Sequence, residues 1–146
     1  MEAYAENRKA RFNNEILDTI EAGLALTGKE VKSVRKGNLS LQGSYATIKD
    51  GEAWLLNADI TPYQAAAGTE DPDRRRTRKI LLNRKQIDEI LRRMDSERIV
   101  IVPLSVYPKA RYIKLSLGIG HPRKSFDKRE TIKKRDIGKE IGKRIK

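Results

Sequence analysis

The first 122 residues contain several short stretches in which apolar and polar positions alternate, and this pattern predicts a mainly β fold. Residues 16–22 partly alternate, and segments 44–49 and 52–57 have the composition of a strand pair. Between these two segments stands Asp50-Gly51, a dipeptide that tolerates the positive φ angles of a type I′ hairpin turn. Further strands are expected at 80–82, 99–102 and 113–117, with Tyr112, Lys114 and Ser116 facing away from the apolar row of the last one.

Two helices are predicted where capping residues precede a helical repeat of apolar positions. Thr27 and Glu30 have the spacing of a capping box, and Gly37 is expected to end this short helix. Asn83 and Gln86 repeat the arrangement before a second helix. One face of that helix is expected to be core, because its apolar residues follow at i, i+3, i+4 and i+7: Ile87, Ile90, Leu91 and Met94.

The elements follow in the order strand, helix, two hairpin strands, strand, helix, two strands, with a long polar loop expected at 64–78. Six short strands with two helices favour a small closed or nearly closed antiparallel barrel. Periodicity does not distinguish between barrel types. Tyr45, Trp54 and Tyr107 fall in these strands, so we expect them in the core rather than as stacking surfaces.

Positive charge is concentrated near the C-terminus. The 146 residues include 32 Lys and Arg against 20 Asp and Glu, a net charge of +12. Residues 123–146 hold 11 of the cations and 4 of the acids, a net of +7, which leaves +5 for the rest. Their large apolar residues are isoleucines and one phenylalanine, too few for a core. We therefore predict a folded body at 1–122 and a basic tail at 123–146 that is disordered when free.

A positive field of this size attracts phosphate backbones, although composition alone also allows an anionic membrane surface or an acidic protein. No apolar run approaches the ~20 residues that span a bilayer, and the N-terminus lacks the apolar stretch of a signal peptide. Cysteine is absent, so no disulfide or thiolate chemistry is expected. The expectation is a cytoplasmic protein that does not bind membranes.

Catalytic chemistry has little support in the residue types. The single histidine, His121, is expected in the loop after the last strand, and with no cysteine it excludes the usual zinc sites and Cys/His nucleophiles. The acidic residues Glu70, Asp71 and Asp73 are typical of a solvated loop rather than a metal site. Phosphate-cradling and dinucleotide-binding glycine motifs are not found. We expect no enzymatic activity, no cofactor and no metal.

Two features favour RNA instead. The cluster Arg74-Arg75-Arg76, with Arg78, suits bidentate phosphate contacts better than a purely solubilising role. Phe126 stands in the basic tail with no core to join, which makes it the best candidate for stacking on a base.

A series of motifs runs along nearly the whole chain in a defined order. They are Asn7-Arg8-Lys9-Ala10-Arg11, Glu21-Ala22-Gly23, Leu26-Thr27-Gly28-x-Glu30-Val31-Lys32-Ser33-x-Arg35, Ser44-Tyr45-Ala46, Ile60-Thr61-Pro62-Tyr63, Arg76-x-Arg78-Lys79-Ile80-Leu81-Leu82-Asn83, Val102-Pro103-Leu104 and Asp127-Lys128-Arg129-Glu130. In this conjunction the chain resembles the small protein B family, the tmRNA-binding proteins of bacterial trans-translation.

The resemblance implies an oligonucleotide-binding (OB-fold-like) barrel of about six strands with flanking helices. It implies that the body binds the tRNA-like domain of tmRNA in place of a missing anticodon arm. The tail would enter the vacant mRNA channel of a stalled small ribosomal subunit, order there as a helix, and so permit peptide tagging and ribosome release. The implied partners are tmRNA and the small-subunit RNA at the decoding centre, with the protein a monomer.

The resemblance also implies functional residues. Contacts to tmRNA, or the shaping of that surface, fall on Asn7, Arg8, Lys9, Arg11, Glu21, Glu30, Lys32, Ser33, Arg35, Arg76, Arg78, Leu81 and Lys114. Contacts of the tail near the decoding site fall on Lys124, Phe126, Asp127, Lys128, Arg129, Lys133, Lys134 and Arg135. Glu30 keeps an alternative interpretation, that it serves only as the capping partner of Thr27.

The chain departs from the family pattern in three places. Phe12-Asn13-Asn14 stands where family members usually have a histidine and then a tyrosine, Pro122-Arg123-Lys124 replaces Gly-Lys-Lys, and the arginine-rich loop is longer. Two other classes remain open: an accessory RNA-binding protein of the ribosome, and a nuclease, which a metal-dependence assay with structured RNA would detect.

Overall fold

Antiparallel pairing of three long strands forms the centre of the fold, which a computed structural model describes for residues 3–62 and 73–123. Strand β2 (Asn14–Leu24) lies along β9 (Tyr112–Pro122), and β9 pairs on its other side with β8 (Val100–Lys109). The other described elements are β1 (Ala5–Glu6), α1 (Arg8–Asn13), α2 (Gly28–Arg35), β3 (Leu39–Ser40), β4 (Tyr45–Lys49), β5 (Glu52–Leu56), β6 (Asp59–Ile60), β7 (Arg78–Leu81) and α3 (Arg84–Glu97).

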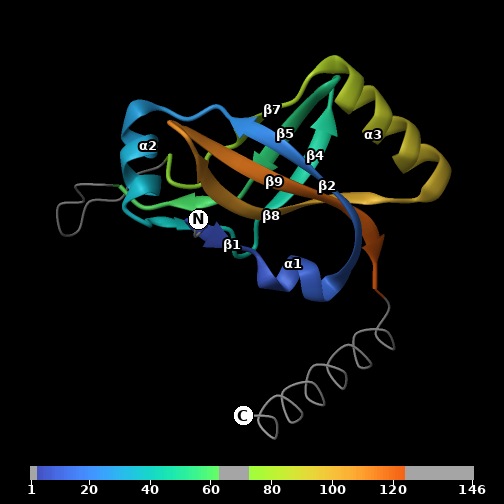
Figure 1. The fold of residues 1–146 in the computed structure, drawn as a ribbon, viewed down its shortest axis with the longest axis horizontal. Helices are drawn as coiled ribbons and strands as arrows, with labels where there is room; N and C mark the ends of the chain where they lie inside the picture. The colour runs from blue at the N-terminus through green and yellow to red at the C-terminus, as the bar shows by residue number, and fades with distance from the viewer. Residues whose placement is uncertain (1–2, 63–72, 124–146) are drawn as a thin grey trace, which may run out of the picture.

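The main sheet has seven strands in the order β1-β8-β9-β2-β7-β5-β4, while β3 and β6 form a separate pair (Figure 1). The expected class, antiparallel β with flanking helices, is confirmed. The barrel, however, is not closed: β4 packs near β8 but pairs only with β5 in the described residues. The edge of β8 that closure would need is instead occupied by β1, at Ser105 and Val106.

The core fills the space between the sheet and the helices. Ala53, Leu55, Leu115 and Leu117 from the strands are at most 1% exposed. Helix α2 contributes Val34 and α3 contributes Ile90, which are equally inaccessible and belong to the same cluster. In both helices only a few residues are buried, which is typical of a helix that packs one face inward and leaves the other in solvent.

Local signals in the sequence correctly locate the helix starts and the hairpin. Both capping boxes are formed, Thr27 with Glu30 at α2 and Asn83 with Gln86 at α3. Asp50 and Gly51 adopt φ angles of 54° and 75°, which the type I′ turn between β4 and β5 requires.

Other expectations are wrong. Leu91, predicted on the core face of α3, is 41% exposed, because it lies on the flank of a stripe that Ile87 and Ile90 already fill. Tyr45 is 49% exposed at the edge strand β4 rather than buried. His121 lies within β9 opposite Glu15, not in a loop after the strand. Strands β1, β3 and β6, of two residues each, and helix α1 are too short for periodicity to reveal.

Candidate RNA interface

Arg78 is the centre of a buried charged cluster that also contains Glu30 and Arg76. The Arg78 side chain is 1% exposed, and its Nε donates a 2.7 Å hydrogen bond to Oε2 of Glu30. Its two terminal nitrogens donate to backbone carbonyls of Ala58, Arg76, Asp73 and Arg74 at 2.8–3.2 Å. The guanidinium therefore joins α2 to β6 and to the described end of the arginine-rich loop.

This burial argues against a direct contact between Arg78 and RNA phosphates. Arg76 is more accessible, with its side chain 33% exposed, but its guanidinium also binds both carboxylate oxygens of Glu30. The arginine cluster that the sequence favours for RNA is in this part internally paired.

Glu30 has two structural roles at once. Its Oε1 accepts a hydrogen bond from the Thr27 amide in the capping box, and the same carboxylate binds the two arginines. Burial opposes ionisation of Glu30, but hydrogen bonds from Arg76, the Thr27 amide and Arg78 outweigh it and lower the pKa of the carboxyl below 4.5. The capping box is therefore formed, but Glu30 does not serve only as the capping partner of Thr27, because it also pairs with Arg76 and Arg78.

A second acidic residue holds the neighbouring arginines. Arg74 forms a two-pronged pair with Asp59, with both N–O distances 2.9 Å, and Arg75 lies 3.6 Å from the same carboxylate. Hydrogen bonding to Arg74 lowers the pKa of Asp59 despite partial burial. Together with the Ile60 amide, which donates to the Arg74 carbonyl, these contacts fasten the loop end to β6.

An open hollow is lined by residues of the β8–β9 hairpin tip, α2 and the ends of β2 and β7. Helix α2 and the hairpin tip are found on the left of Figure 1. The volume of the hollow is about 330 Å³. Its apolar lining includes Leu24, Leu26, Val31 and Leu81, of which Leu81 is 49% exposed. Three cations lie on the lining: Arg35, Arg111 and Lys114.

The rim of the hollow is tied together by two contacts. Arg35 donates a 2.8 Å hydrogen bond to the carbonyl of Arg111, which links α2 to the hairpin tip. Lys114 Nζ lies 5.5 Å from the ring centroid of Tyr112, within cation–π range. The structure thus places Arg35, Leu81 and Lys114, three of the residues predicted to contact tmRNA, around one hollow. Tyr112 and Arg111 belong to the same surface, although sequence analysis did not select them.

Next to this surface, Glu21 on β2 is held by residues of β8. Tyr107 donates a 2.6 Å hydrogen bond to one oxygen of the Glu21 carboxylate, and Lys109 a 2.8 Å bond to the other. The bonds from Lys109 and Tyr107 lower the pKa of Glu21. Burial and then the bond to Glu21 raise the pKa of Tyr107 to about 12. The carboxylate therefore orients the hairpin besides any role toward RNA.

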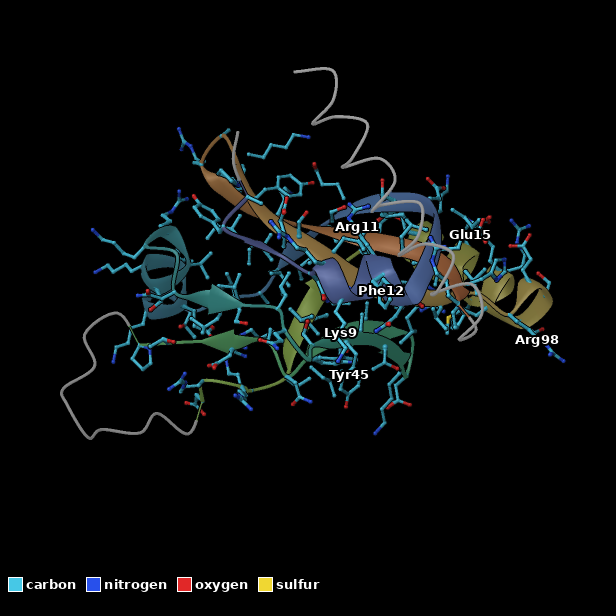
Figure 2. All side chains as sticks on the ribbon, turned by 90° about the horizontal axis from the view of Figure 1, so that it is seen from below. Lys9, Arg11, Phe12, Glu15, Tyr45 and Arg98 are labelled. Carbon is cyan, nitrogen blue, oxygen red and sulfur yellow. The ribbon has the colours of Figure 1, made fainter. Side chains whose placement is uncertain are left out.

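The N-terminal candidates lie at the other end of β2. Asn7 is buried as the N-cap of α1, its side chain bonded to the Pro103 carbonyl and the Ala10 amide. Lys9 and Arg11 are exposed and extend to opposite sides of α1 in Figure 2, as residues two apart on a helix must. Arg8 is also exposed on this helix.

The predicted site residues outside the buried cluster therefore lie in two places: some around the hollow, and others on or next to α1 at the other end of β2. Lys32 is exposed on α2 near the hollow, while Ser33 on the same helix is 2% exposed and faces the interior. Arg123, the first residue of the predicted tail, lies beside α1, where its amide donates a 2.8 Å hydrogen bond to the Asn13 carbonyl. The predicted tail contacts, Lys124, Phe126, Asp127, Lys128, Arg129, Lys133, Lys134 and Arg135, lie outside the described residues.

No group of three or more His, Asp or Glu residues in residues 3–62 and 73–123 is placed to hold a metal ion. Among the same residues, no helix has the length and apolar character needed to cross a membrane.

Comparison with known proteins identifies the family. The family model described as SmpB protein matches residues 4–146. An SsrA-binding protein of Gloeothece citriformis (strain PCC 7424) is 45% identical over 141 residues, covering 97% of this chain and 91% of that protein. An SsrA-binding protein of Streptococcus agalactiae serotype III (strain NEM316) is 44% identical over 143 residues, with the same coverage.

A solved structure agrees with these relatives. One chain of "tmRNA-SmpB: a journey to the center of the bacterial ribosome" is 41% identical, with a TM-score of 0.65, over 82% of this chain and 84% of that one. Near-complete coverage by the family model, relatives above 40% identity and a shared fold agree with the motifs read along the sequence. This chain belongs to the SmpB protein family.

Proposed function

We propose that this protein binds the tRNA-like domain of tmRNA with the surface around the hollow and acts in trans-translation. The observation that carries the proposal is the convergence of Arg35, Arg111 and Lys114 on one apolar hollow. Cations fix RNA through its phosphates, while an apolar surface contacts exposed bases. The names of the SsrA-binding relatives and of the tmRNA–SmpB structure support the choice of RNA.

Phosphate contacts of the body are assigned to Lys9, Lys32 and Lys114. Lys9 and Lys32 are exposed and Lys114 is half-buried at the hollow. Each is expected to release about one counterion on binding, so loss of any of them weakens all RNAs and lowers the salt dependence. Arg8 and Arg11 on α1 would add to the same field beside Lys9.

The tail is proposed to act on the ribosome rather than on tmRNA. Its net charge of +7 suits the RNA-lined mRNA channel of the small subunit. We propose that Lys124, Lys128, Arg129 and the cations at 133–135 contact RNA there, with Phe126 stacking on a base of the decoding centre and Asp127 completing the motif. The Arg123–Asn13 hydrogen bond fixes the end of the body from which this tail continues.

The test separates the two activities in one set of proteins. At physiological salt the full chain should bind the tRNA-like domain more tightly than fragments of ribosomal RNA of equal length. A chain truncated after Pro122 should keep most of that affinity and lose peptide tagging on stalled ribosomes. Phe126→Ala combined with Lys128→Ala should resemble the truncation in both assays.

Three results would contradict the proposal. Equal affinity for the tRNA-like domain and ribosomal fragments would favour an accessory ribosomal protein. Metal-dependent cleavage of the structured RNA would favour a nuclease. If truncation after Pro122 reduces tmRNA binding as much as it reduces tagging, body and tail do not have separate activities.

A further inference from the structure

The hollow combines features that neither a duplex nor a phosphate alone would require. A phosphate-binding surface needs cations, yet the lining here also includes Leu24, Leu26 and Val31. Leu81 and Tyr112 leave large apolar surfaces exposed at its sides, 49% and 62% respectively. Its volume of about 330 Å³ falls at the lower end of the range for small-ligand pockets, roughly 300–1,000 Å³.

The Tyr112 ring is contacted by a cation but stays largely exposed. Lys114 Nζ lies over the ring at 5.5 Å from its centroid and so occupies one face. Tyr112 is nevertheless 62% exposed, so part of the residue remains accessible to a ligand. A neighbouring cation restricts the ring to fewer orientations, which reduces the entropy lost when a base stacks on it.

Three cations are among the residues that line the hollow: Arg35, Arg111 and Lys114. Arg35 donates to the Arg111 carbonyl through Nη2, an arrangement that fixes its guanidinium at the rim. Arg111 is exposed on the other side of that bond, and Lys114 lies beyond Tyr112. A lining that combines apolar residues with three cations suits a nucleotide, whose base is apolar on its faces and whose phosphates are anionic.

We propose that the hollow receives one unpaired nucleotide of the bound RNA, with its base stacked on the Tyr112 ring and against Leu81. Arg35, Arg111 and Lys114 contact the phosphates that flank it. A base inside a duplex cannot reach such a position, whereas loop nucleotides can be turned outward and stacked on aromatic side chains. This inference rests on the proposed function and specifies which part of the RNA the surface recognises.

The experiment uses the full chain and the isolated tRNA-like domain. Tyr112→Leu should raise Kd by about 5- to 150-fold, the range expected when one base–aromatic stack is lost, and should leave the salt slope unchanged. Tyr112→Phe should bind as the wild type, because it keeps the ring. Tyr45→Leu is the matched control, since Tyr45 is also exposed but lies on edge strand β4, and it should not change Kd.

The RNA is varied in parallel. Each unpaired nucleotide of the tRNA-like domain is replaced in turn by an abasic one, and the variants are titrated with wild-type and Tyr112→Leu protein. One abasic position should weaken wild-type binding by the same factor as Tyr112→Leu, and the two changes together should cost no more than either alone. At the other positions, the factor by which the abasic change raises Kd should multiply the factor for Tyr112→Leu.

The outcomes distinguish this inference from the proposed function. If wild-type protein does not prefer the tRNA-like domain, the proposed function fails and this inference with it. Two results would overturn the nucleotide pocket and leave the proposed function standing, provided that wild-type protein prefers the tRNA-like domain. One is that Tyr112→Leu binds the domain as tightly as wild type. The other is that, at every abasic position, the effects of the RNA change and of Tyr112→Leu on Kd multiply.

Discussion

Arg78 and Arg35 carry the same guanidinium group, but Arg78 is 1% exposed inside the protein whereas Arg35 is exposed at the rim of the hollow. Arg78 donates to Glu30 and to four backbone carbonyls. Arg35 donates to one, that of Arg111. The buried cluster joins separate elements of the fold, whereas the charge at the rim remains exposed. Counting cations therefore overestimates the surface that is available to RNA.

The sharpest test of this contrast is Arg78→Met. The change leaves the Glu30 carboxylate without its most buried partner and removes the donors to four carbonyls, so we expect a loss of about 3–5 kcal/mol in the free energy of unfolding. The melting temperature should fall by roughly 10 °C or more. Denaturant unfolding followed by circular dichroism measures both. Arg75→Met is the control, because its side chain is 71% exposed, and it should cost less than about 0.5 kcal/mol.

Glu30→Gln tests the same cluster through pH. Because the folded-state pKa of Glu30 is below 4.5, ionised Glu30 stabilises the protein above that pH, and the contribution disappears as pH falls through the folded value. At pH 7 the variant should be less stable by about 1.5–3 kcal/mol, as for hydrogen bonds to a charged group. The difference from wild type should shrink below pH 4.5. A difference that is constant from pH 7 to pH 3 would contradict the ionised cluster.

On the rim, the expected effect is on binding and not on stability. Lys114→Ala should weaken the tRNA-like domain several-fold and lower the slope of log K against log salt by about one. Its melting temperature should stay within about 2 °C of wild type. Lys49→Ala removes an equal charge from β4 and should leave the slope unchanged. If the two variants have equal slopes, Lys114 does not contact a phosphate.

The smallest effect concerns Tyr107. This residue is partly buried, so its exposure is intermediate between that of Arg78 and that of Arg35. Burial and the bond to Glu21 raise its pKa to about 12, so its phenol should ionise only in strongly alkaline solution. Glu21→Gln should move this titration back toward 10, the ordinary value. NMR of protein with labelled tyrosine rings follows Tyr107 separately from Tyr45 and Tyr112. An unchanged titration in Glu21→Gln would mean that the carboxylate does not hold the hairpin.

Elements whose signals lie within a few residues could be predicted from the sequence. The capping boxes at Thr27 and Asn83 and the turn at Asp50-Gly51 each depend on neighbours no more than three residues away. The motifs also identified the family, because their order along the chain needs no knowledge of contacts. Two-residue strands such as β1 carry too little pattern to be recognised.

Only the tertiary structure decided which charged residues are buried in ion pairs and which remain exposed. Arg78 is 48 residues from Glu30 and 20 from Ala58 in the sequence, and no local pattern indicates that these groups meet. For Tyr112 the sequence predicted one part and not the other. Strand alternation predicted that the residue faces away from the apolar row of β9. Its place in one hollow with Leu81 and Arg35 depends on how three separate elements pack. Backbone preferences act over a few residues, whereas burial and pairing of charges depend on the folded chain as a whole.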